Sequence, residues 1–251
     1  VVPFSIENPA LWSPDRPALY TVTATIGDET VTDSVTVRTG FRAIAASTAG
    51  GLTINGERVP VHGVTLYHDN ALSGGTLTPQ DYDADLRQIR TLGANALRSA
   101  VIPHAQYLYD RCDEQGMLVW VDTPLHRSSF LGDVAYYAMP AFEQNGMEQL
   151  QEIIAQNINH PSVVMWGIFS RLWPRGDDVT PYLRRLNDAA HALDPSRPTV
   201  ASSDQNGGIN FITDLIVWRQ DVGWRRGSTD DVILWRDQLQ KNWSHLRSAV
   251  S

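Results

Sequence analysis

The chain has 251 residues, of which 42% are apolar, and it carries a formal net charge of −8. This length and apolar content suffice for one large buried core with a small module beside it, which excludes disorder as the main state. An acidic chain without a compensating basic run offers no electrostatic footprint for nucleic acid or an anionic membrane, so neither is an expected partner. No apolar stretch reaches the roughly 18 residues of a membrane span, and the first residues lack the pattern of a signal peptide, so the compartment stays open.

Residues 1–48 carry the pattern of antiparallel strands. Apolar and polar side chains alternate in LYTVTATIG (19–27) and ETVTDSVTVRTGF (29–41), which meet at a Gly-Asp-Glu turn and predict a hairpin. Two strands do not make a stable sandwich alone. We therefore expect either the C-terminal strands of an immunoglobulin-like β-sandwich or an arm packed on the next domain, with the small residues of AASTAGG (45–51) as the junction.

Residues 49–251 show short apolar runs that alternate with amphipathic segments, which is typical of parallel strands covered by helices. The predicted strands are 59–67, 94–101, 117–124, 162–169, 198–203 and 215–220, and the predicted helices are 78–93, 104–115, 141–158 and 179–193. Cys112, the single cysteine, falls within a helix and is expected to be a buried structural thiol.

Six such units without a glycine-rich phosphate loop favour an α/β fold of the (β/α)8 TIM-barrel type over a doubly wound sheet. A seventh strand is predicted at LRSAV (246–250). A closed barrel has eight strands, so the domain is expected to be incomplete, with six to seven strands. Another chain segment, a partner or a second copy in a homo-oligomer would have to supply the remainder.

Several stretches occur in an order that resembles the family 2 glycoside hydrolases, which include β-galactosidases, β-glucuronidases and β-mannosidases. They are NPALWSPDRPALY (8–20), GFR (40–42), INGERVPVHGVTLYHD (54–69), LGANALRSAVIP (92–103), YDRCDEQGMLVWVDTP (109–124), NHPSVVMWGIFSR (159–171) and TDLIVWRQDVGW (213–224). The resemblance implies an immunoglobulin-like domain followed by a barrel. It also implies a jelly-roll domain before residue 1 and a nucleophilic Glu at the end of the seventh strand, beyond Ser251.

The catalytic position of the family is altered in this sequence. A retaining glycosidase needs one protonated and one ionised carboxyl group about 5 to 5.5 Å apart. The family's acid lies in an Asn-Glu pair that follows W-x-x-x at the end of the fourth strand, and here WGIF is followed by Ser170 and Arg171. Because Arg has no proton to give at working pH, no catalytic residue is intact here. Arg171 is expected either to turn to solvent or to pair with a carboxylate in the mouth of the pocket.

Other pocket positions also depart from the family pattern, although Arg98 is kept. Val101 and Ile102 stand where the family has His and Tyr, Asp122 replaces Glu, and Arg219 and Asp221 stand where Asn and Tyr are expected. The residues expected to contact substrate, partly by this resemblance, are His68, Asp69, Arg98, Asp122, Trp166, Asp204, Trp218, Asp221 and Trp224.

Each of these expectations has a structural alternative. The carboxylates can cap loops instead of forming a replacement catalytic pair, His68 can be a satisfied strand-end histidine, and the Trp side chains can be core instead of stacking on a sugar. Trp120, in mid-strand, is expected in the core. His68, Asp69, Asp122 and His126 lack metal-ligand spacing, so neither a metal nor another cofactor is expected.

Three functions remain open at this point. The first is a β-glycosidase domain, β-galactosidase-like by resemblance, that acts on carbohydrate and is impaired by the change at Arg171. The second is a non-catalytic carbohydrate-binding or regulatory relative that kept the barrel. The third is an assembly module that completes its barrel on a partner or a second copy.

Overall fold

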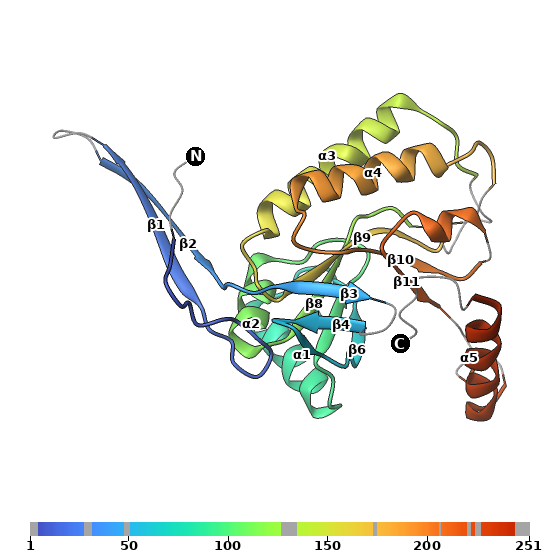
Figure 1. Cartoon of the computed structure of the whole chain (residues 1–251), viewed down its shortest axis with the longest axis horizontal. Coiled ribbons are helices and arrows are strands. Elements are labelled where there is room, and N and C mark those ends of the chain that lie inside the picture. The colour runs from blue at the N-terminus through green and yellow to red at the C-terminus, as the bar shows by residue number, and fades with distance from the viewer. Residues whose placement is uncertain are drawn as a thin grey trace.

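The computed structural model describes residues 5–27, 32–47, 51–126, 135–172, 175–205, 207–219, 222–223 and 227–243. The strands form a two-stranded hairpin, a three-stranded antiparallel sheet and a six-stranded parallel sheet (Figure 1). Within these residues no helix is long and apolar enough to cross a membrane.

The parallel sheet is a partial TIM barrel, as predicted. Its strands lie in the order β11-β10-β9-β8-β7-β6, so that each strand pairs with the one before it in the chain. They are β6 (Gly63–Leu66), β7 (Ala96–Ser99), β8 (Leu118–Asp122), β9 (Val163–Ser170), β10 (Thr199–Ser203) and β11 (Leu215–Trp218). This sequential order is that of a barrel, whereas a doubly wound sheet reverses its order. The strand predicted at 246–250 lies outside the described residues.

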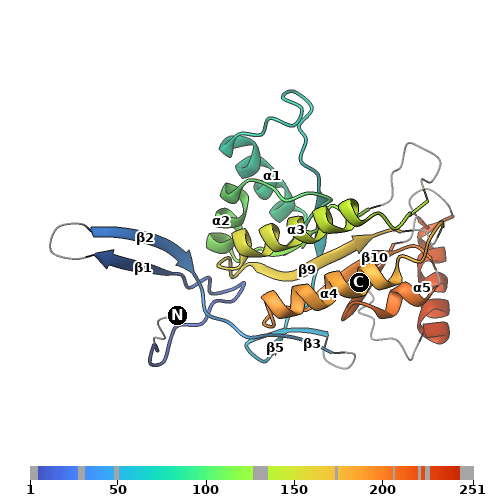
Figure 2. The same ribbon diagram turned by 90° about the horizontal axis from the view of Figure 1, so that it is seen from above.

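Helices follow the strands and cover the outer face of the sheet (Figure 2). They are α1 (Pro79–Thr91), α2 (Gln106–Gln115), α3 (Pro140–Asn157) and α4 (Thr180–Leu193), with a 3-10 turn η1 (Gly208–Phe211) and α5 (Thr229–Trp243) near the C-terminus. The four predicted helices are confirmed, with small shifts at their ends.

Local sequence explains where α1 begins and where α2 ends. The Thr78 hydroxyl accepts a hydrogen bond from the Asp81 backbone, and the Asp81 carboxylate accepts one from the Thr78 backbone, while Pro79 occupies the first turn. Helix α2 ends at Gly116, whose φ is +69°. A Cβ there would lie 2.0 Å from the Pro14 carbonyl oxygen, so the close approach of the N-terminal segment requires glycine.

The core has one part on each face of the parallel sheet. The larger part lies between the sheet and the helices and includes Leu86, Leu108, Cys112 and Leu183, each with no exposed surface. Cys112 is thus the buried structural thiol that was predicted, and burial raises the pKa of its thiol well above the ordinary value. The smaller part fills the barrel at the amino ends of the strands.

A small antiparallel sheet closes the amino-terminal end of the barrel. It consists of β3 (Ile44–Ser47), β4 (Gly51–Ile54) and β5 (Glu57–Arg58). Leu52 and Ile54 of β4 pack in the inner core cluster. Within the junction predicted at 45–51, Ala45 and Ala46 pair with Thr53 and Leu52 as strand residues, and the domain boundary itself stays a prediction.

The N-terminal hairpin projects away from the barrel (Figure 1). Strand β1 (Tyr20–Gly27) pairs with β2 (Thr32–Thr39) in the predicted alternation, so that Val22 lies opposite Val37. Toward its tip the apolar face is open, since Ile26 is 77% exposed. The hairpin is confirmed, and its membership of an immunoglobulin-like domain over residues 1–48 stays a prediction.

Polar contacts join the N-terminal segment to the barrel at the start of β9. Trp12 Nε1 donates to the Asp113 carbonyl oxygen at 2.9 Å, and Arg42 donates to the carbonyl oxygens of Pro161 and Val163 at 2.6 and 2.8 Å. Arg38 pairs with Glu114 at 2.6 Å. These bonds hold the segment against the amino-terminal end of the barrel, opposite the carboxyl ends of the strands.

Candidate functional site

Sites in barrel proteins lie at the carboxyl ends of the strands, and the expected polar residues gather there. Ser170 ends β9 and Arg171 follows it, Asp204 follows β10, and Arg219 follows β11. The Arg171 amide donates to the Ser202 carbonyl oxygen at 2.7 Å, and the Arg219 amide donates to the Ser203 carbonyl oxygen at 2.8 Å. The sheet is thereby extended by one residue, which fixes the backbone at this edge.

Arg98 and Asp122 form an ion pair inside the barrel, below the edge. Arg98 Nε donates to Asp122 Oδ2 at 2.9 Å, and Nη2 donates to Ser170 Oγ at 2.9 Å. The guanidinium carbon lies 4.1 Å from the ring centre of Trp120. The structure thus brings together two predicted pocket residues, and it buries the Asp122 side chain, which is only 2% exposed.

Burial decides the protonation behaviour of Asp122. Loss of solvent raises the pKa of this carboxyl group to about 6, although the charge of Arg98 lowers it. Gly167 on β9 faces the group, and a Cβ at that position would lie 2.3 Å from Asp122 Oδ1 and 2.4 Å from Trp120 Nε1. Glycine is therefore required beside this pair.

Arg171 forms an ion pair with Asp204 at the edge of the barrel. Its Nε donates to Asp204 Oδ2 at 3.1 Å, and the two side chains are 19% and 20% exposed. The φ of Arg171 is +55°, in the left-handed region. Of the two alternatives for Arg171, the structure shows pairing with a carboxylate. At the position that the resemblance assigns to the family's acid, the structure thus has a cation paired with an anion.

His68 is engaged by the fold around it. Its Nε2 lies 3.1 Å from the Gly75 carbonyl oxygen and its Nδ1 lies 3.2 Å from the Tyr82 hydroxyl. Its ring packs against His104, which sequence analysis missed. Burial lowers the pKa of His104 to about 4, so this ring is neutral near pH 7. Both contacts support the alternative of a satisfied histidine for His68, whereas Asp69 is exposed beside it.

Of the tryptophans that the structure describes, Trp166 differs from expectation. Trp166 is 1% exposed and lies in the cluster between sheet and helices, where its Nε1 donates to Asp194 Oδ2 at 2.9 Å, so the prediction that it lines a sugar pocket is wrong. Trp120 packs on the inner cluster as expected and also reaches Arg98. Trp218, at the end of β11, is partly buried, while Asp221 and Trp224 lie outside the described residues.

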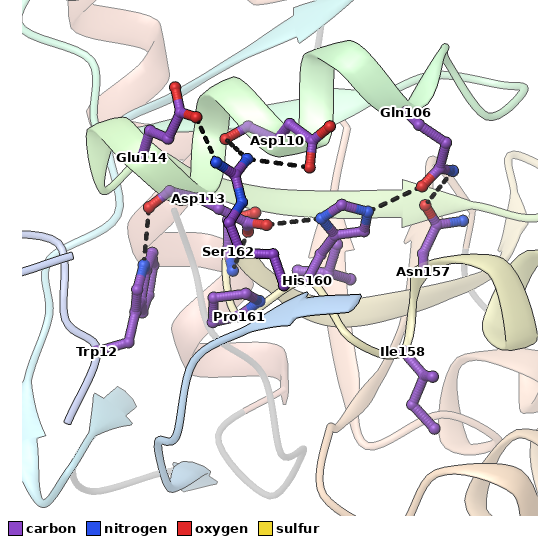
Figure 3. Close-up of polar contacts among 12 residues, drawn as sticks. Trp12, Gln106, Asp110, Asp113, Glu114, Asn157, Ile158, His160, Pro161 and Ser162 are labelled. Atoms are coloured by element: carbon purple, nitrogen blue, oxygen red, sulfur yellow. Dashed lines mark hydrogen bonds and ion pairs between the residues drawn. The ribbon is translucent and has the colours of Figure 1, made fainter. Parts of the chain in front are cut away.

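A cluster at the opposite end of the barrel contains possible metal ligands (Figure 3). Ligand atoms of Asp110, Asp113 and His160 lie within 4.8 Å of one another, and this is the one such group among the described residues. Asp113 already accepts hydrogen bonds from the Ser162 amide at 3.0 Å and His160 Nδ1 at 2.6 Å, and Asp110 pairs with Arg38. Since protein donors occupy these oxygens, we assign the cluster a structural role.

The hydrogen bonds behind His160 have fixed directions. Asn157 Nδ2 donates to the Ile153 carbonyl oxygen, so its Oδ1 accepts from Gln106 Nε2 at 3.1 Å. Gln106 Oε1 is thereby turned toward His160 Nε2 at 2.9 Å. With the Asp113 carboxylate at Nδ1, both ring nitrogens of His160 face acceptors (Figure 3).

Comparison with known proteins agrees with this architecture. The family model described as "Glycosyl hydrolases family 2, TIM barrel domain" matches residues 46–242, and the model "Glycosyl hydrolases family 2" matches residues 1–42. A β-glucuronidase of Bacteroides fragilis is 35% identical over 100% of this chain and 36% of its own length. A β-galactosidase of Thermoanaerobacter pseudethanolicus is 33% identical over 83% of the chain and 26% of its own length.

Solved structures show the same similarity. The crystal structure of Parabacteroides merdae β-glucuronidase superposes with a TM-score of 0.85 and 26% identity, over 97% of this chain and 30% of that one. The chain thus spans about a third of the length of the relatives it matches.

Proposed function

Because the chain belongs to the family 2 glycoside hydrolases, we propose that the carboxyl ends of its barrel strands bind a β-glycoside without acid-assisted cleavage of its glycosidic bond. The proposal depends chiefly on one observation, the ion pair of Arg171 with Asp204 at the family's acid position. The related β-glucuronidases and β-galactosidases support a β-glycoside as the class of ligand. The activity of this protein and the identity of its sugar are part of the proposal.

The missing acid matters most for poor leaving groups. General acid catalysis contributes roughly 10²- to 10⁴-fold, because the departing oxygen takes up a proton as the bond breaks. A guanidinium cannot supply this proton. Hydrolysis of alkyl glycosides and disaccharides is therefore expected to be slow, while nitrophenyl glycosides, whose leaving group departs as a stable anion, suffer less.

Neither neighbouring carboxyl group is placed to replace the acid. Asp204 accepts the hydrogen bond from Arg171 Nε, so its Oδ2 serves as an ion-pair acceptor. Asp122 has a pKa raised to about 6, which suits an acid, but its side chain is buried beneath Arg98. A substrate at the edge of the barrel would meet the guanidinium of Arg98 first.

The test uses the gene product that contains this chain and its Arg171→Glu and Arg171→Gln variants. We expect the Glu variant to gain activity on disaccharides relative to p-nitrophenyl glycosides, and the Gln variant, the matched control without a carboxyl group, to gain none. Turnover of natural disaccharides by the unmodified protein at the 1 to 10³ s⁻¹ typical of enzymes would refute the proposal. Sugar binding by calorimetry without any turnover would favour a non-catalytic binding protein.

An assembly role is a second candidate, favoured by the edges of the partial barrel. Among the described strands, β6 and β11 each pair with one neighbour in the parallel sheet, and Gly63 and Thr65 of β6 are exposed. Light scattering on the gene product tests whether a second copy covers these edges, since a monomer at all concentrations would exclude it.

A further inference from the structure

The guanidinium of Arg171 uses a small part of its hydrogen-bonding capacity. The group carries five N–H donors, and the one at Nε donates a hydrogen bond to Asp204. Among the residues that the structure describes, Nη1 and Nη2 make no hydrogen bond. The side chain is nevertheless only 19% exposed, so the N–H groups at Nη1 and Nη2 are largely shielded from solvent.

The position of this group is fixed before any ligand arrives. The Arg171 amide bonds to Ser202, and the Nε bond to Asp204 sets the plane of the guanidinium. The charge of the neighbouring Arg98 is already balanced by Asp122, whereas the printed ion pair of Arg171 involves only its Nε. A planar guanidinium with two free Nη groups matches the paired oxygens of a carboxylate or phosphate.

We propose that Arg171 forms an anion-binding subsite on the leaving-group side of the barrel mouth. The inference rests on the proposed function, in which a glycoside binds at this edge. An acid at this position faces the glycosidic oxygen, so a guanidinium in its place faces the group attached to that oxygen. The ligands selected are glycosides that carry a carboxylate or phosphate next to the glycosidic oxygen.

Asp204 sets both the geometry and the strength of this subsite. Its carboxylate holds the Nε edge of the guanidinium and leaves the Nη edge to the ligand. Its negative charge opposes an incoming anion, which limits the preference to about tenfold, the lower end for hydrogen bonds to charged groups. Removing that charge with Asp204→Asn is therefore expected to strengthen anion binding, whereas a purely structural ion pair predicts no such gain.

The experiment is calorimetric titration of the gene product with glycosides that differ only in the charge of the attached group. The ligands are methyl, 2-aminoethyl and carboxymethyl β-D-galactoside and β-D-galactose 1-phosphate, with the same series on glucuronic acid. We expect the carboxymethyl and phosphate ligands to bind about tenfold more tightly than the methyl glycoside. The affinities of the carboxymethyl glycoside and the 1-phosphate show whether carboxylate or phosphate is the preferred anion. Comparison of the galactose series with the glucuronic acid series distinguishes binding at this subsite from recognition of a carboxylate on the sugar itself.

Variants assign the effect to Arg171. Arg171→Gln should remove the preference for anions, and Arg171→Glu should reverse it in favour of the 2-aminoethyl glycoside. Arg236→Gln, which breaks an exposed ion pair with Asp237 on α5, is the matched control and should change nothing. A thermal melt of each variant confirms that it is folded.

Two outcomes overturn the inference in different ways. Equal affinity for methyl and anionic glycosides, unchanged by Arg171→Gln, refutes the subsite and leaves the proposed function standing. Failure of every ligand in both series to bind refutes the proposed function, and the subsite falls with it.

Discussion

Asp122 provides a test of how burial and ion pairing compete inside this barrel. The perturbation is Asp122→Asn, which keeps the shape of the side chain and one acceptor oxygen but removes the ionisable group. Burial raises the pKa of the carboxyl group from an ordinary value near 3.8 to about 6, in spite of Arg98. In the folded state, desolvation therefore destabilises the carboxylate by more than the ion pair with Arg98 stabilises it.

The sign and size of the effect follow from this pKa. Between about pH 4 and pH 6 the folded protein binds more protons at Asp122 than the unfolded chain does, so its stability falls as the pH rises. A pKa raised from 3.8 to about 6 corresponds to about 3 kcal/mol of unfolding free energy, which is lost once the pH exceeds the pKa of the folded state. Relative to the wild type, the Asn variant is thus expected to gain about 3 kcal/mol in unfolding free energy between pH 4 and pH 7.5.

Urea unfolding of both proteins, followed by tryptophan fluorescence at several pH values, measures this difference. Asp188→Asn, at an exposed position on α4, is the control for the same substitution without burial of the side chain. The reasoning would be refuted if the difference in unfolding free energy between Asp122→Asn and the wild type did not change with pH. It would also be refuted if the variant became less stable than the wild type as the pH rises.

A further prediction concerns packing beside this carboxyl group. Gly167→Ala should destabilise the barrel by roughly 1–3 kcal/mol, because the new methyl group would overlap atoms of Asp122 and Trp120. An unchanged melting temperature would contradict this.

Periodicity along the sequence was sufficient for the elements and their order. Alternation predicted the hairpin of β1 and β2, and the apolar runs predicted all six parallel strands, because the spacing of side chains that must be buried is a local property. The strand at 44–47, which overlaps the predicted junction region, was not predicted, because its pairing is not a local property. Small residues such as Ala45 and Ala46 carry little local preference, and their pairing with β4 depends on contacts with the barrel floor.

The orientation of side chains in the central strand was decided only by the tertiary structure. All eight residues of β9 are buried, so polarity does not distinguish its two faces. The register of β9 also shifts against both neighbours, near Val119 on β8 and near Val200 on β10, and each shift moves later side chains to the other face. For this reason Trp166 points toward the helices, although its place in the sequence suggested the mouth of the barrel.

The same division applies to the candidate site. From the sequence alone it follows that Arg171 is not a proton donor, because this depends on the chemistry of one side chain. The carboxylate that pairs with Arg171 could not be identified from the sequence. Asp204 is 33 residues further along the chain, and it meets Arg171 because β9 and β10 are adjacent parallel strands whose carboxyl ends lie side by side. Likewise Asp122 is one of several similar carboxylates in the sequence, and only its burial beneath Arg98 separates its pKa from that of an ordinary aspartate.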